Sequence, residues 1–500
     1  MIINLPFSCN NACSNCPGDR CFTEDWISEE LRKDPKTFFI VGGEPTIQQA
    51  VPLCELAEKL VQDVPDCKIV LCTNGRTLAY KSVAKSLIQA GISNFVIFLR
   101  HTDKKKNDEL SGADEGFEQT IHAIEHLTRY PIGVKIQPFE ETDKEETEKL
   151  LNKLNKNAEQ YGRRFTASKN DNLTELTNQD GKESSKNIPN SIVHAIEDQH
   201  KIKIDKLVPV WSGNYNLIYL ATSGKDKLFV KMVCTHKEKN RKQLVEFEEE
   251  LIRFLNENKI RTSKIINTAN DAPSFLFEKT PVILYEFIEG KTLGKRMGHI
   301  DDAFSTLIKF HKAIKRFGKI PIGDLIEKTK KNVKTAEEIL KTESTLKAKP
   351  AIKEKEEELH RIINKIKETS EKTLPKIPDT ILHGDCRAEN SIIRDGEAHI
   401  LDFQNSFKGP AIYDLVIFCV SFIPQENFIQ ESTQLLDRFC KELDLSEAEK
   451  AAFPELLQIY LLKTLTQRCG EYTGEDKKNT EWVFEMFDIA EKMCSLPDSD

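Results

Sequence analysis

The chain has 500 residues, of which 39% are hydrophobic and 30% are charged, and its formal net charge is -8. This composition is typical of a globular protein with two domains, because one core rarely serves so long a chain. The mild acidity argues against nucleic acid as the main partner, since binding to phosphates needs clustered positive charge. No apolar run approaches the roughly 20 residues that span a bilayer, and we see no signal-peptide pattern. We therefore expect a cytoplasmic protein that does not bind membranes.

Three cysteines lie close together in the stretch FSCNNACSNCPG: Cys9, Cys13 and Cys16 follow the spacing C-x3-C-x2-C. In a reducing compartment such a cluster predicts metal binding rather than disulfides. Thiolates select zinc, copper(I) or iron-sulfur clusters. Three of them would leave one iron of a cubane cluster without a protein ligand, whereas structural zinc would need a fourth ligand such as Cys21.

From residue 1 to about 165, short apolar runs alternate with amphipathic stretches. The predicted strands are FFIVG, KIVLCTN, NFVIFL and IGVKIQP, and helical text such as AVPLCELAEKLVQD and SVAKSLIQAG separates them. This rhythm predicts four or five βα units around a parallel sheet. That number is enough for a partial barrel but short of the eight units of a closed one.

Two short motifs stand at the ends of the first two of these strands. GGEPT follows FFIV, and its Gly42 and Gly43 allow the backbone to approach a ligand closely. The carboxylate of Glu44 beside them can accept a hydrogen bond from an ammonium group. GGEPT taken alone also fits an ordinary βα turn. CTNGR, which includes Asn74, ends the next strand.

C-x3-C-x2-C, GGEPT, CTNGR and DELSGADEGFEQTIHAIEHL, in this order, resemble the radical S-adenosylmethionine (SAM) superfamily across residues 1 to about 140. The resemblance implies a partial (β/α) barrel that cleaves SAM reductively at a [4Fe-4S] cluster to generate a substrate radical. It also implies an electron donor such as flavodoxin or ferredoxin. The implied cluster ligands are Cys9, Cys13 and Cys16. The implied SAM-binding residues are Gly42, Gly43, Glu44 and Asn74.

Residues 163 to 190 contain almost no large apolar side chains and predict a polar linker. We place the linker at 166–190, between a first domain at 1–165 and a second at 191–500. Beyond it, strands are followed by long helices. The Lys/Glu-dense text from 325 to 373 predicts an exposed helical pair.

The run ILHGDCRAENSIIRDGEAHILDF places Asp385, Asn390 and Asp402 on a predicted loop and the end of the strand that follows. Phosphoryl transfer from ATP needs a carboxylate that orients a hydroxyl and accepts its proton. It also needs oxygen ligands for the Mg²⁺ ion that bridges the phosphates. These three side chains supply both requirements.

The pattern H-G-D-x4-N followed by I-L-D-F resembles the aminoglycoside phosphotransferase and choline kinase branch of the protein-kinase-like fold. The resemblance implies a two-lobed α+β domain, with a small lobe at 191–290 and a large lobe at 291–500, that binds ATP and Mg²⁺. It implies Asp385 as the catalytic base, and Asn390 and Asp402 as metal ligands. Asp414 would brace the catalytic loop, and His383 would orient it.

The small lobe should contain a lysine that holds phosphates and a helix carboxylate that positions it. Lys231, in DKLFVKMV, is the predicted lysine, and Glu248 falls on the apolar face of the next helix. Gly213 is the only glycine of the predicted nucleotide loop. Residues 285–287 are candidates for adenine contacts, and His311 is expected to pack in the core.

The leading hypothesis is a bifunctional enzyme, with a radical SAM half and a half that phosphorylates a hydroxyl of a small molecule; a peptide substrate stays open. One alternative is a kinase whose cysteine domain senses SAM or redox state. Another is a radical enzyme whose kinase-like half only binds substrate. A zinc-stabilised scaffold without enzymatic activity is the third.

Overall fold

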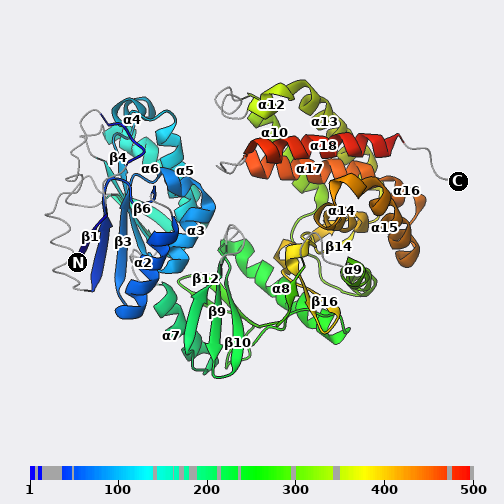
Figure 1. The fold of residues 1–500 in the computed structure, drawn as a ribbon, viewed down its shortest axis with the longest axis horizontal. Coiled ribbons are helices and arrows are strands. Elements are labelled where there is room, and N and C mark those ends of the chain that lie inside the picture. The colour runs from blue at the N-terminus through cyan, green and yellow to red at the C-terminus, as the bar shows by residue number, and fades with distance from the viewer. Residues whose placement is uncertain are drawn as a thin grey trace. The chain divides into compact units, whose positions relative to one another are not determined.

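The structure is a computed structural model in which the chain forms two compact units (Figure 1). The first unit comprises residues 1–242 and 266–286, and the second comprises 243–265 and 287–500. None of the helices in the described part of the chain is long and apolar enough to cross a membrane. The described residues are 1–5, 9–13, 36–47, 50–138, 144–161, 163–167, 174–178, 188–210, 216–234, 238–293, 300–341, 350–469 and 476–495.

A seven-stranded sheet begins the first unit. Its strands are β1 (Ile2–Asn4), β2 (Thr37–Val41), β3 (Lys68–Thr73), β4 (Asn94–Leu99), β5 (Gly133–Pro138), β6 (Arg163–Ala167) and β7 (Thr174–Asn178). Their order is β1-β2-β3-β4-β5-β7-β6, with β1 to β5 parallel and β7 paired antiparallel with both β5 and β6. The predicted parallel sheet is therefore confirmed. Its curvature into a partial barrel of the radical SAM type stays a prediction.

Helices cover one face of this sheet (Figure 1). They are α2 (Ala50–Asp63), α3 (Lys81–Ala90), α4 (Lys104–Ser111), α5 (Gly116–Leu127) and α6 (Lys144–Ala158), with short turns η2 (Arg76–Ala79) and η3 (Glu159–Tyr161). Alternate strand residues such as Phe38 and Ile40 pack against the helices, while Phe39 and Val41 belong to a second buried cluster. Because side chains alternate along a strand, that second cluster lies on the opposite face. Both faces of the sheet are therefore buried, as parallel sheets require.

Strand β7 lies within residues 166–190, which their composition predicts to be a linker. It pairs with β5 and β6 through backbone hydrogen bonds, which do not depend on apolar side chains. For that reason its polar sequence, TELTN, gave no strand signal. The division into domains at 165 and 190 itself stays a prediction.

A five-stranded antiparallel sheet completes the first unit, in the order β11-β12-β10-β9-β8. Its strands are β8 (Lys206–Pro209), β9 (Leu217–Ser223), β10 (Asp226–Met232), β11 (Phe275–Phe277) and β12 (Thr280–Glu286). Helix α7 (Ile188–His200) precedes them in the chain. Leu87 of α3 and Leu217 of β9 belong to one continuous hydrophobic core. Nε2 of Gln89 on α3 also donates to the carbonyl of Ile218 at 2.6 Å. The strands predicted to form a kinase small lobe thus share a core with the N-terminal sheet.

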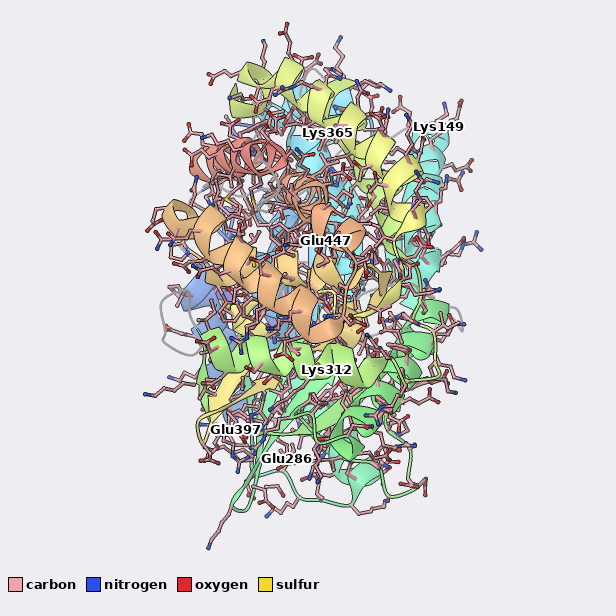
Figure 2. The ribbon with its side chains drawn as sticks, turned by 90° about the vertical axis from the view of Figure 1, so that its right-hand side faces the viewer. Lys149, Glu286, Lys312, Lys365, Glu397 and Glu447 are labelled. Atoms are coloured by element: carbon pink, nitrogen blue, oxygen red, sulfur yellow. The ribbon has the colours of Figure 1, made fainter. Side chains whose placement is uncertain are left out.

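The second unit is mainly helical. Its helices are most of α8 (Glu238–Glu257), α9 (Ile300–Ile314), α10 (Leu325–Lys341), α12 (Pro350–Glu354), α13 (Glu356–Glu368), α14 (Ala411–Phe422), α15 (Phe428–Leu443), α16 (Glu447–Ala451), α17 (Phe453–Cys469) and α18 (Asp476–Cys494). All twelve residues of α14 are buried, so this helix forms the centre of the unit. Helices α9 and α13 carry charged residues such as Lys312 and Lys365 on their outer faces (Figure 2).

Short strands flank the loops that carry Asp385, Asn390 and Asp402 in this unit. They are β13 (Lys291–Thr292), β14 (Thr380–Leu382), β15 (Ser391–Arg394), β16 (Glu397–Ile400) and β17 (Phe407–Gly409). Strand β15 lies between β13 and β16, and β14 pairs with β17. The predicted helical pair within 325–373 is present as α10 and α13, each of which buries one apolar stripe.

Candidate functional site

The loop after β14 brings Asp385 and Asn390 into contact. Nδ2 of Asn390 donates to the Asp385 carboxylate oxygen Oδ2 at 3.0 Å and to the Asp385 backbone carbonyl at 2.8 Å. Arg387 binds the same carboxylate with two nitrogens, at 2.6 Å to Oδ1 and 3.2 Å to Oδ2. Such a two-pronged pair fixes the direction of a carboxylate more tightly than a single bond does.

Asp402 follows β16 and has a φ of 68°, in the left-handed region. The N–H of Leu401, the residue before it, donates to the Asn390 carbonyl at 2.9 Å. Gly384 makes a second close approach possible, because a Cβ at that position would lie 2.3 Å from the Asn405 carbonyl oxygen. The structure thus brings the loop of Asp385 and Asn390 next to the loop of Asp402.

Asp414, on α14, holds the backbone of this loop through hydrogen bonds. Its carboxylate accepts hydrogen bonds from the N–H groups of His383 at 2.7 Å and Gly384 at 2.9 Å. Burial alone would raise the pKa of Asp414, but the hydrogen bond and charge of His311 help to lower it below its usual value. These contacts match the bracing role predicted for Asp414. His311, expected to pack in the core, is also the partner of this carboxylate.

His383 is fully buried, and its ring lies 4.7 Å from the ring of Phe403 between centroids. Burial lowers the pKa of His383. Its Nδ1 accepts a hydrogen bond from the Asp385 N–H at 3.2 Å. These contacts hold the loop in position, as predicted for His383.

The side chains of the predicted phosphate-binding lysine, Lys231, and of its predicted partner, Glu248, are both buried. Lys231, on β10, is 3% exposed, and its Nζ lies 6.0 Å from the ring centroid of Tyr285 on β12. Glu248, on α8, is 2% exposed. Lys231 belongs to the first unit and Glu248 to the second, and their predicted pairing stays a prediction. Gly213 lies outside the described residues.

A second candidate site lies at the carboxyl ends of the parallel strands in the first unit. One pocket there is lined by Cys9, Cys13, Gly43, Asn74 and Arg76 together with Thr73, Phe98, Arg100, Asn107, Ser111, Gly116 and Thr120. The structure therefore brings together residues from the cysteine stretch, GGEPT and CTNGR, which are far apart in the sequence. Cys16, the third predicted cluster ligand, lies outside the described residues.

Glu44 is not among the residues that line this pocket. It is 1% exposed, and its oxygens accept hydrogen bonds from the Thr73 hydroxyl at 2.6 Å, the Asn74 N–H at 2.7 Å and the Thr46 hydroxyl at 2.6 Å. Burial raises the pKa of Glu44, although these bonds oppose the shift. Its contacts are those of a positioning residue that ties the end of β2 to the end of β3.

Gly42 and Gly43 have different surroundings. A Cβ at Gly42, whose φ is 155°, would lie 3.0 Å from the carbonyl oxygen of Leu5, so a glycine permits the close approach after β1. Gly43 lines the pocket. Of the GGE motif, Gly43 is therefore the residue placed to contact a ligand.

The side chains of Arg76, which the sequence did not single out, and of Asn74 hold the cysteine loop. Arg76 donates to Asn11 Oδ1 at 2.9 Å and to the Asn10 carbonyl. Nδ2 of Asn74 donates to Asn10 Oδ1 at 2.6 Å. Arg76 stands in the quoted motif CTNGR, two residues after Asn74, and this position was the signal that could have identified it.

Among the described residues, no three His, Cys, Asp or Glu side chains gather closely enough to hold a metal ion. The cysteines do differ in accessibility. Cys9 and Cys13 are partly exposed, whereas Cys54, Cys67 and Cys72 in the same unit are buried. Burial raises the pKa of Cys54 to about 12, as expected for an inert thiol. Cys9 and Cys13 are therefore the thiols in this unit's described part that a ligand can reach.

A comparison with known protein families found a match that covers the site around Asp385. Residues 206–451 match the model of the phosphotransferase enzyme family, APH. This segment is just under half of the chain and includes Asp385, Asn390 and Asp402. The C-terminal part of the chain therefore carries a kinase-like phosphotransferase domain. No curated protein matches the chain.

The chain is also similar to several solved structures. Spectinomycin phosphotransferase in complex with ADP and spectinomycin is 15% identical, with a TM-score of 0.47 over 61% of this chain and 98% of that one. Amicoumacin kinase in complex with AMP-PNP and Ca²⁺ is 14% identical, with a TM-score of 0.47 over 60% and 92%. Choline kinase from Streptococcus pneumoniae is 18% identical, with a TM-score of 0.42 over 61% and 98%.

Proposed function

We propose that the C-terminal part of this chain transfers the γ-phosphoryl group of ATP to a hydroxyl of a small molecule. The contact between Asp385 and Asn390, within the segment that matches the phosphotransferase family, carries this proposal. A P–O bond forms to the hydroxyl oxygen, the bond from the γ-phosphorus to its bridging oxygen breaks, and ADP leaves. The hydroxyl proton passes to the carboxylate of Asp385.

The residues around Asp385 have separate tasks in this reaction. Arg387 holds the carboxylate in one direction through its two bonds. Asn390 uses its amide nitrogen to bind Asp385, so its amide oxygen is the atom that remains for a metal ion. Together with the carboxylate of Asp402 it offers the oxygen ligands that Mg²⁺ prefers. Mg²⁺, when bound, offsets the negative charge of the phosphates.

The remaining predicted residues complete this proposal. Lys231 would bind the phosphates of ATP, and Glu248 would position Lys231. The burial of both side chains supports these roles, because a buried charge needs a partner.

Replacement of Asp385 tests the proposal. We expect Asp385→Asn to lower ADP formation by a factor of about 10² or more, while Mg-ATP binding and the circular dichroism spectrum are retained. Asp395→Asn is the matched control, because Asp395 is an exposed residue of the turn between β15 and β16. Wild-type turnover by Asp385→Asn would contradict the assignment of the catalytic base.

For the N-terminal part, we propose a [4Fe-4S] cluster on Cys9, Cys13 and Cys16, with SAM bound beside Gly43 and Asn74. The shared pocket of the two accessible cysteines with Gly43 and Asn74 supports it. The cluster, when bound, would supply the electron that cleaves SAM to methionine and a 5'-deoxyadenosyl radical, and this radical would take a hydrogen atom from the substrate to leave a substrate radical and 5'-deoxyadenosine. Asn74 and Arg76 hold the cysteine loop in place through Asn10 and Asn11. The chain would then be bifunctional and would need an electron donor of the flavodoxin or ferredoxin type.

Low-temperature electron paramagnetic resonance tests this second half. Anaerobically reconstituted, reduced protein should give a [4Fe-4S] signal whose shape changes when SAM is added. Cys9→Ala should lose the signal, and Cys494→Ala should keep it, because Cys494 is an exposed cysteine of α18. A silent spectrum with stoichiometric zinc would instead support a structural site. A SAM-sensitive signal without SAM cleavage would support the alternative of a sensor domain.

A further inference from the structure

Two lysines on the long helices of the second unit lie near the catalytic loop. Lys328 is in the first turn of α10, and Lys463 is on α17, which packs against α10. Lys463 is close enough to Asp385 and Arg387 for their charges to affect its pKa, and Lys328 is close enough to be affected by Lys463. Both ammonium groups therefore lie in the neighbourhood of the loop that carries Asp385.

Three aromatic rings connect these lysines to the loop, and we call them the aromatic floor: Phe407, Tyr413 and Tyr460. Neighbouring ring centroids are 5.9 Å apart for Phe407 and Tyr413, and 6.2 Å apart for Tyr413 and Tyr460. Nζ of Lys328 lies 4.4 Å from the Phe407 centroid, and Nζ of Lys463 lies 5.5 Å from the Tyr460 centroid.

The floor reaches the catalytic loop at Gly384. A Cβ placed on Gly384 would lie 2.7 Å from Cε1 of Phe407, so the ring of Phe407 touches the residue directly before Asp385. Lys328, which lies over this ring, is therefore also close to the residue before the proposed catalytic base.

The described carboxylates offset the positive charge at this place only in part: Asp385 and Asp414 act on Lys463, and Glu327 acts on Lys328. Among the residues that the structure describes, no carboxylate forms an ion pair with Lys328 or Lys463. Asp385 is already bound by Arg387, and Asp414 by His311. Desolvation and the neighbouring Lys463 and Lys331 lower the pKa of Lys328 to about 8, although its side chain is solvent-accessible. Two ammonium groups in such surroundings favour an anion between them.

We propose that Lys328 and Lys463 bind a negatively charged group, a carboxylate or a phosphate, of the molecule whose hydroxyl is presented to Asp385. This inference rests on the proposed phosphoryl transfer and names the chemical class of its acceptor. The aromatic floor is itself buried and helps to fix the positions of the two lysines, which neutralise the charge of the acceptor. The acceptor would thus be an anionic hydroxyl compound rather than a cationic amine.

A set of compounds with one carbon skeleton tests the proposal. Isothermal titration calorimetry on the full chain, saturated with Mg²⁺ and AMP-PNP, would compare glycerol, glycerate, glycerol 3-phosphate and 3-amino-1,2-propanediol. With nucleotide already bound, the phosphates of ATP do not compete for the lysines. We expect glycerate or glycerol 3-phosphate to bind at least about tenfold more tightly than the amine and glycerol. The two anions also distinguish a carboxylate site from a phosphate site.

Variants connect this preference to the two lysines. Lys328→Met with Lys463→Met should remove the preference for the anion. Lys330→Met is the matched control and should keep it, because Lys330 is an exposed lysine of the same helix. Equal binding of the amine and the anions, no measurable binding of any of the four, or an unchanged preference in the double variant would overturn the inference. Asp385-dependent ADP formation, measured with Mg-ATP on separate samples of the same variants without AMP-PNP, reports on the proposed function independently of this result.

Discussion

Nε2 of His311 lies 3.1 Å from Oδ2 of Asp414, and both side chains are almost completely buried. The same carboxylate accepts the N–H groups of His383 and Gly384. One buried pair therefore links α9 and α14 to the loop that carries Asp385. The position of the catalytic base depends on helices that contribute no catalytic side chain of their own.

Asp414→Asn should destabilise the second unit and slow turnover together. The amide nitrogen of asparagine would face one of the donors that the carboxylate now accepts from, and a buried donor left unsatisfied costs about 1 to 3 kcal/mol. Urea denaturation of the full chain, followed by circular dichroism, would measure the change in the free energy of unfolding. Asp437→Asn is the control, because Asp437 forms only a surface ion pair with Lys450, and such pairs contribute about 1 kcal/mol or less. Equal effects of the two substitutions would contradict the bracing role.

The same carboxylate predicts a pH dependence. Its pKa is lower in the folded protein than in the unfolded chain. The resulting stabilisation is fully present above the unfolded-state pKa of about 4 and is lost as the pH falls through the folded-state pKa. Asp414→Asn should therefore lose this part of the acid sensitivity, which unfolding curves recorded from neutral pH down to pH ~3 would show.

Gly384→Ala should be far more harmful than Gly396→Ala, although both glycines have a φ of 76°. A Cβ at Gly384 would lie 2.3 Å from the Asn405 carbonyl, whereas a Cβ at Gly396 meets nothing within 4 Å. Both variants carry the backbone cost of a left-handed alanine, about 1 to 2 kcal/mol. Only Gly384→Ala should also separate the loops of Asp385 and Asp402 and abolish ADP formation. Similar turnover in the two variants would show that this close approach is not needed.

Local spacing explains which parts of the site could be predicted from the sequence. Asp385, Asn390 and Asp402 lie within one short run, so a single loop and strand place them. The core shared by Leu87 and Leu217 was not predictable, because those residues are far apart in the sequence and no local pattern pairs them. Strand β7 was missed because its ladder needs only backbone groups.

The two lysines of the inferred anion site were missed for a related reason. They stand on helices whose charged residues are indistinguishable in the sequence from a solvated face. Only the packing of α10 against α17 brings Lys328 and Lys463 together.

Arg387 should affect the rate of turnover more than the binding of ATP. Its guanidinium holds both oxygens of Asp385 at 2.6 Å and 3.2 Å. Arg387→Met would leave the carboxylate free to rotate, and we expect kcat to fall by a factor of about 10 to 100 with little change in the KM for ATP. Arg387→Lys should restore only part of the loss, because an ammonium group cannot bind both oxygens in the same way. Steady-state kinetics of ADP formation would distinguish this role from a fold-stabilising one, which would lower the amount of active enzyme without a rescue by lysine.

Glu44→Gln should destabilise the first unit, although glutamine has nearly the same shape. The glutamate oxygens accept from the Asn74 N–H and from the hydroxyls of Thr46 and Thr73. The amide nitrogen of glutamine would face one of these donors and leave it unsatisfied, at a cost of about 1 to 3 kcal/mol. Glu55→Gln, at an exposed position of α2, is the control and should change the free energy of unfolding by less than about 0.5 kcal/mol.

The stability difference between wild type and Glu44→Gln should also depend on pH. Burial raises the folded-state pKa of Glu44, so the carboxyl group contributes less to stability as the pH rises above about 4. The difference in the free energy of unfolding should therefore shrink from acidic to neutral pH. Chemical denaturation across that range would measure it, and a difference that grows with pH would contradict the assigned direction of the shift.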